Sequence, residues 1–113
     1  MRPDRPRLIA PSYQWQVLPE LIANDAYLSS WNTSIFQNAS QYLGNSPVPY
    51  YMDGGNGILD PARLIKQHVK AFSYVYRMTN DTKWLDAVWT ELQVCLPRYP
   101  LLYYLILLLE CRW

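Results

Sequence analysis

The sequence predicts an all-α fold made of antiparallel helix pairs. Apolar residues recur at three- and four-residue steps over three stretches of the chain, as they do on one face of a helix. Prolines and glycines gather in the connections between these stretches, and no stretch has the alternating pattern of a strand. At 113 residues, half of them hydrophobic, the chain is long enough for one domain at most.

The first residues, up to Pro11, are expected to be extended because prolines block helix formation. Ser12 is a candidate cap for a short turn over residues 13–18, which Pro19 ends or restarts. Residues 25–44 then have an amphipathic helical pattern, and a glycine at position 44 is a natural helix stop. The apolar face of this helix holds Leu28, Trp31, Ile35, Ala39 and Tyr42.

The clearest helix follows a loop over residues 45–57, which contains two prolines and three of the four glycines. Asp60 is the expected N-cap, with Pro61 at the first helical position. Beyond them the helix has an apolar face and a polar face. The apolar face holds Leu64, Ile65, Val69, Phe72, Val75 and Tyr76, and the polar face holds Arg63, Lys66, Lys70, Ser73 and Arg77.

A third helical pattern begins after "TNDT", where Asn80 or Asp81 can cap it. The short connection predicts an antiparallel hairpin with the preceding helix. Five tryptophans and ten tyrosines make the apolar faces wider than three or four helices can cover. We therefore expect the beginning of a larger α/α array, whose tryptophans await further helices. The apolar face of this last helix holds Trp84, Leu85, Val88, Trp89 and Leu92.

Composition narrows the range of chemistry. A formal net charge of +1 argues against nucleic-acid binding through bulk electrostatics, and no phosphate-loop or dinucleotide fingerprint occurs. Two cysteines and a single histidine provide no zinc spacing, so no metal and no cofactor are predicted. A disulfide between Cys95 and Cys111 stays open.

The N-terminal stretch "MRPDRPRLIAPS" lacks the apolar core of a secretory signal. Three glycosylation sequons, at Asn32, Asn38 and Asn80, nevertheless point to a secreted, glycosylated ancestor.

The segments "RPRLIAPSYQWQVLPELI", "YLSSWNTSIFQNA" and "YYMDGGNGILDPARLIKQHVKAFSYVYRMTNDTKWLDAVWTELQ" resemble the N-terminal region of heparinase II/III-like polysaccharide lyases. In that family an alginate-lyase- or chondroitin-lyase-like (α/α) toroid precedes a β-rich domain. The resemblance covers residues 5–93, and residues 51–89 are its most specific part. It implies that residues 1–93 are the first, incomplete part of a toroid.

The resemblance also implies β-elimination on a uronic-acid-containing polysaccharide. In the family a neutral or charge-stabilising group quenches the substrate carboxylate, a tyrosine or histidine abstracts the neighbouring proton, and no redox cofactor is needed. No motif of this chain matches the catalytic residues, so none is carried over. The expected partner is an acidic polysaccharide.

Three features are candidates for a site. Helical spacing puts His68 on the apolar face with Ile65 and Phe72. This favours a core or hairpin-packing histidine over a buried general base, for which no partner is visible. The loop residues Tyr51 and Asp53 are our candidate substrate contacts, because tyrosines stack on sugar rings and glycines allow close approach. The alternative is that this loop only serves its turn.

The third candidate is the basic stripe, which we define as Arg63, Lys66, Lys70 and Arg77. It is either a solvated outer face or an attractant for a polyanionic glycan. Asp86 and Glu91 on the next helix are possible ion partners for it.

The ending "VCLPRYPLLYYLILLLECRW" departs from this pattern. Residues 101–109 are too few for a membrane span, which needs roughly 20 apolar residues. A terminal core helix would need burial on all sides, since the segment has no polar face. We favour intron read-through or a frameshift for residues 94–113, because Val-Cys can be encoded by an intron-like GTATGT.

Two functions follow. The chain is either a fragment of a polysaccharide lyase, inactive alone, or a small non-catalytic helical protein that binds a glycan or a partner.

Overall fold

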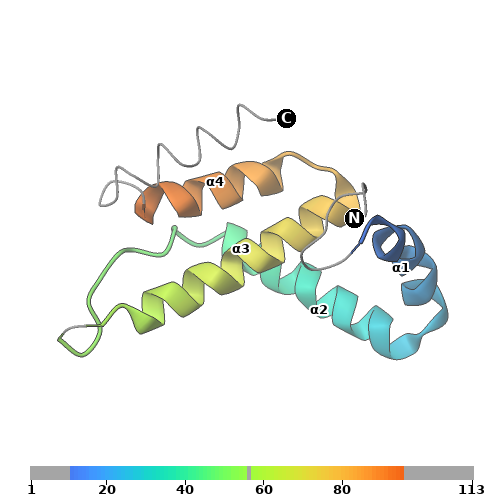
Figure 1. Ribbon diagram of the computed structural model, residues 1–113, viewed down its shortest axis with the longest axis horizontal. Helices are drawn as coiled ribbons and strands as arrows, with labels where there is room; N and C mark the ends of the chain where they lie inside the picture. Colours follow the sequence, from blue (N-terminus) through green and yellow to red (C-terminus); the bar gives the residue numbers. More distant parts are fainter. Residues whose placement is uncertain (1–10, 56, 96–113) are drawn as a thin grey trace, which may run out of the picture. The chain divides into compact units, whose positions relative to one another are not determined.

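The computed structural model describes residues 11–55 and 57–95. Within them lie four helices, α1 (Ser12–Asn24), α2 (Ala26–Leu43), α3 (Leu59–Thr79) and α4 (Lys83–Cys95), as Figure 1 shows. The one β feature of these residues is an isolated antiparallel bridge between Asp53 and Gly57, so the all-α prediction is confirmed. The predictions for residues 1–10 and 96–113, including the apolar ending and Cys111, lie outside the described residues.

The chain forms two compact units, Met1–Phe36 and Gln37–Trp113, which are described separately below. The first unit contains α1 and the N-terminal part of α2. The second contains the end of α2, the loop 44–58, α3 and α4.

Helix α1 runs continuously through Pro19, so the prediction of a short turn that Pro19 ends or restarts is wrong. An interior proline removes one helical hydrogen bond and costs about 3 kcal/mol or more. The turn after it is closed by two other bonds: Asp25 N–H donates to the Leu21 carbonyl at 3.0 Å, and the Asn24 side chain donates to the Glu20 carbonyl at 3.0 Å. Ser12 is the first helical residue and does not cap, because the N-cap position belongs to Pro11.

Helix α2 agrees with its prediction to within one residue at each end. Its N-terminus is capped by Asp25, whose Oδ1 accepts from the Tyr27 N–H at 2.8 Å and the Leu28 N–H at 3.2 Å. On its expected apolar face Ala39 is fully buried, whereas Trp31 is 56% exposed.

Helices α3 and α4 form the predicted antiparallel hairpin and lie side by side (Figure 1). Phe72 and Val75 of α3 are buried, and so is Trp84 of α4. The Phe72 and Trp84 rings are in contact, with centroids 6.0 Å apart. Trp84 therefore already has its packing partner, and the expectation that it awaits further helices is wrong.

The connection between these helices uses both predicted capping residues, each for a different helix. Asn80 adopts a left-handed conformation with φ of 56°, and its N–H donates to the Tyr76 carbonyl at 2.7 Å, which ends α3. Asp81 caps α4 by accepting from the Lys83 N–H at 3.1 Å.

Truncation of Phe72 is expected to destabilise the hairpin strongly. Phe72→Ala should lower the free energy of unfolding by about 3–5 kcal/mol, because it leaves a cavity against Trp84. Urea denaturation followed by circular dichroism measures this. Ser73→Ala, an exposed change on the same helix, is the control and should stay within about 0.5 kcal/mol. Equal losses in the two variants would contradict this packing.

Acid is expected to remove the contribution of Asp81 to stability. The Lys83 side chain and then the Lys83 N–H bond to the Asp81 carboxylate and hold its pKa below the ordinary value. A lowered folded-state pKa gives stabilisation that is complete above the unfolded-state pKa and is lost as pH falls through the folded-state pKa. The wild type should therefore melt at a higher temperature than Asp81→Ala at neutral pH, and this gap in Tm should close in acid. A gap of equal size in acid would contradict the assignment.

Candidate functional site

A buried histidine–glutamate pair lies in the second unit. Among the described residues, the buried polar or charged side chains are His68, 6% exposed, and Glu91, 4% exposed. His68 comes from α3 and Glu91 from α4, and the distance from His68 Nδ1 to Glu91 Oε1 is 2.6 Å. When Glu91 is a carboxylate, its oxygen accepts this hydrogen bond and Nδ1–H donates it.

The second oxygen of Glu91 binds the loop 44–58. Glu91 Oε2 accepts from the Val48 N–H at 3.1 Å, and Val48 is itself buried. One carboxylate thus connects α4, α3 and the loop. The suggested pairing of Glu91 with the basic stripe is wrong, because Glu91 lies seven residues after the buried Trp84 and so shares its inward face.

Two aromatic rings hold the imidazole of His68. The Tyr42 ring stacks on it with centroids 4.2 Å apart and an interplanar angle of 23°, and the Phe72 ring lies tilted at 6.0 Å. The interpretation of His68 as a core, hairpin-packing residue is confirmed by its burial. The sequence analysis did not identify Glu91 as the partner of His68. The four- and three-residue steps from Trp84 through Val88 to Glu91 nevertheless indicate that Glu91 shares the buried face of its helix.

Asp53 fixes the other end of the loop to the N-terminus of α3. Its Oδ1 accepts from the Leu59 N–H at 3.1 Å, and its Oδ2 accepts from the Asp60 N–H at 2.7 Å. These amides lack helical partners, and the positive end of the helix dipole also favours a carboxylate there. The prediction of Asp60 as N-cap is wrong: α3 starts at Leu59, and Asp60 lies in its first turn.

A glycine allows this capping geometry. A Cβ at Gly57 would lie 2.8 Å from Asp53 Oδ1 and 3.2 Å from the Asp53 carbonyl oxygen, so a side chain there would displace the cap. The Asp53 N–H donates to the Gly57 carbonyl at 2.7 Å and closes the turn. Asp53 therefore has a structural use for both oxygens, while its role as a substrate contact stays a prediction.

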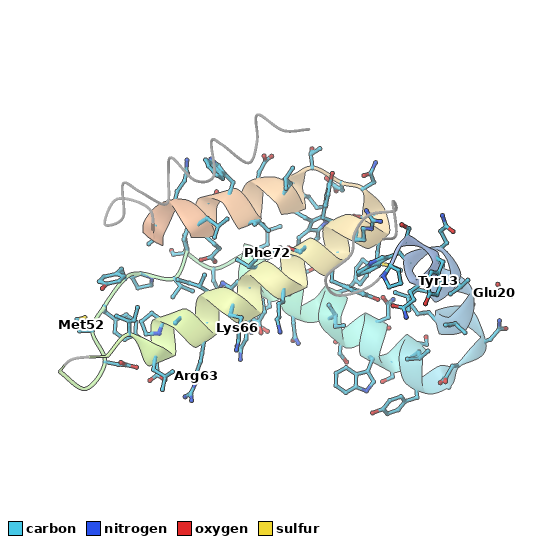
Figure 2. The ribbon with its side chains drawn as sticks, viewed as in Figure 1. Tyr13, Glu20, Met52, Arg63, Lys66 and Phe72 are labelled. Carbon is cyan, nitrogen blue, oxygen red and sulfur yellow. The ribbon has the colours of Figure 1, made fainter. Side chains whose placement is uncertain are left out.

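Two anchors thus hold the loop: the bond from Val48 to Glu91 and the cap formed by Asp53. Tyr51 and Met52 lie between these two anchors in the sequence and are exposed. Tyr51 is 43% exposed and Met52 is 52% exposed. Figure 2 shows Met52 on the loop at the same end of α3 as Arg63, with Lys66 further along that helix. The structure thus brings the candidate Tyr51 loop and the beginning of the basic stripe to one end of α3.

The four residues of the basic stripe are all exposed. Arg63 has a loose contact with Asp60 at 3.7 Å, which is a weak surface pair. With a rise of about 1.5 Å per residue, the cations from Arg63 to Lys70 span roughly 10 Å along the helix. They form a line of positive charge rather than a single anion pocket.

The three sequon asparagines lie at different exposures. Asn38 on α2 and Asn80 at the end of α3 are exposed, whereas Asn32 is half-buried on α2. Their glycosylation stays a prediction.

No protein-family description, curated protein or solved structure matches the chain. Within residues 11–55 and 57–95, no helix has the length and hydropathy needed to cross a membrane. The same residues contain no group of three or more His, Cys, Asp or Glu side chains able to hold a metal ion.

Loss of the Asp53 cap is expected to weaken the start of α3. Asp53→Ala should lower the free energy of unfolding by about 1 kcal/mol, because two amides at the helix N-terminus lose their acceptor. Chemical denaturation measures this, and Asp53→Asn, which retains one acceptor oxygen, should lose less. Stability unchanged in Asp53→Ala would contradict the capping role.

Proposed function

We propose that the second unit binds an acidic polysaccharide through the basic stripe and Tyr51. We further propose that the chain belongs to the toroid part of a polysaccharide lyase of the heparinase II/III-like class that the sequence resembles. The observation that carries the binding proposal is that the loop with the exposed Tyr51 is attached to the helix with the exposed cations. The loop that carries Tyr51 is tied by Asp53 to the helix that carries Arg63 and Lys66.

A polysaccharide suits both parts of this surface. The flat face of a tyrosine gives an amphipathic contact to the apolar face of a sugar ring. Lysines and arginines spaced along a helix attract the regularly spaced carboxylate or sulfate groups of a linear polyanion. Sites on helices are more precisely placed than sites on loops, and the two anchors give the Tyr51 loop comparable support.

Binding, rather than bond cleavage, is the role we assign to the described residues. The resemblance implies β-elimination for the parent enzyme, yet no residue of this chain matches its catalytic motif. His68, the one histidine, is buried between Glu91 and aromatic rings and serves the fold. The surface would thus hold the acidic chain while other residues of a lyase perform the chemistry.

A second candidate is a small non-catalytic helical protein that binds a glycan or a partner. The well-capped α3–α4 hairpin with its own buried core favours this alternative. The two candidates differ in cooperativity. A self-sufficient domain should show one sharp thermal transition, whereas a piece of a toroid should behave as a molten, aggregating species.

The binding proposal is tested by titrating the full chain with heparin, chondroitin sulfate and alginate oligosaccharides, with neutral dextran as the reference ligand. We expect one or more acidic glycans to bind and dextran not to bind. Exchanging both Lys66 and Lys70 for Gln should raise Kd about three- to tenfold, since an exposed ion pair contributes roughly 0.2–1 kcal/mol. Added salt should narrow this difference by screening the charges.

Lys83→Gln is the matched control, because Lys83 is the first residue of α4, pairs with Asp81 of the preceding turn and lies outside the basic stripe. It should leave Kd unchanged. Equal loss in the control and the double variant, or no binding of any acidic glycan, would contradict the proposal. Unsaturated-uronate absorbance above the blank would contradict the assignment of binding without cleavage.

A further inference from the structure

The loop 44–58 is held at two points that flank Tyr51. On one side the Val48 N–H donates to Glu91 Oε2 at 3.1 Å. On the other side the Asp53 carboxylate accepts from the first two amides of α3. Tyr51 lies three residues after the first anchor and two residues before the second, so few backbone torsions separate it from either.

The two anchors differ in their surroundings. The Asp53 anchor is formed with exposed residues, where water competes for the bonds. The Glu91 anchor is buried, and its carboxylate is itself held by His68, on which Tyr42 stacks. A hydrogen bond away from water is stronger, and breaking it leaves a buried group unpaired.

We propose that Glu91 is a positioning residue for the glycan site: its buried carboxylate sets the path of the loop and thereby places Tyr51 next to the basic stripe. This inference rests on the proposed function. Glu91 does not touch the glycan. It reduces the ordering that the loop would otherwise undergo on binding, which is the usual benefit of a preorganised site.

This role predicts energetic coupling between Glu91 and Tyr51. If Glu91 acts through Tyr51, removal of its carboxylate should matter only while the tyrosine is present. A general loss of stability would instead weaken binding to the same extent in both backgrounds. A double-mutant cycle separates these two cases.

The experiment measures Kd of the full chain for the acidic oligosaccharide that binds best. Tyr51→Ala and Glu91→Ala should each raise Kd about three- to tenfold, as expected for loss of one aromatic contact. Glu91→Ala added to Tyr51→Ala should have no further effect. Val75→Ala, which opens a cavity in the same hairpin far from the loop in sequence, is the stability-matched control and should leave Kd within about twofold.

Two further variants keep the test decisive if Glu91→Ala does not fold. Val48→Pro removes the donor N–H from the loop and leaves the Glu91–His68 pair intact, so it should reproduce the loss of affinity. Glu91→Gln should rescue binding, because its carboxamide can accept from Val48 and donate to His68 Nδ1 when the imidazole proton is on Nε2.

A measurement without glycan tests the anchor itself. Amide hydrogen exchange at Val48 should accelerate about tenfold or more in Glu91→Ala and remain slow in Glu91→Gln, because a buried bonded amide exchanges only on opening. Unchanged exchange in Glu91→Ala, or equal effects of that variant with and without Tyr51, would overturn the inference while glycan binding by the wild type stands. Absence of binding by the wild type would overturn the proposed function and this inference with it.

Discussion

The carboxylate of Glu91 is the constraint on which the second unit depends. An ionised carboxylate removed from water is costly unless its oxygens are bonded. Here α3 supplies an imidazole for one oxygen and the loop 44–58 supplies a backbone N–H for the other. Both bonds form only if α3 and α4 lie close enough for His68 to reach Glu91 and if the loop brings the Val48 N–H to the same carboxylate. The ring of Tyr42, stacked on His68, is part of the same arrangement.

Hydrogen bonds to two carboxylates, those of Glu91 and Asp53, fix the loop 44–58 in the second unit. The loop is tied down by Glu91 and by Asp53, and these bonds are made by its backbone and by a capping carboxylate. The side chains of Tyr51 and Met52 are exposed to solvent, and so are the four cations of the basic stripe on α3. Asp53 has a structural role as the cap of α3, and its role as a substrate contact stays a prediction, as does that of Tyr51.

Aromatic residues have different uses in the two units. In the second unit Trp84 packs on Phe72, and Tyr42 packs on His68. In the first unit Tyr27 and Trp31 pair with each other at 6.1 Å and remain largely exposed. We expected the tryptophans to be exposed until further helices cover them. The exposure of Trp31 agrees with this expectation, and the burial of Trp84 contradicts it. The toroid itself stays a proposal.

The sequence by itself determined α2, α3 and α4, the hairpin and the burial of His68, because amphipathic spacing and capping chemistry depend on residues close together in the chain. It also identified Asp81 as a capping residue for α4. Only the tertiary structure decided that α3 is capped by Asp53 from across a glycine turn, that Glu91 faces inward, and that one carboxylate joins three segments. Those contacts link positions far apart in sequence, and periodicity along a single helix does not specify which distant amide or ring a buried carboxylate will meet.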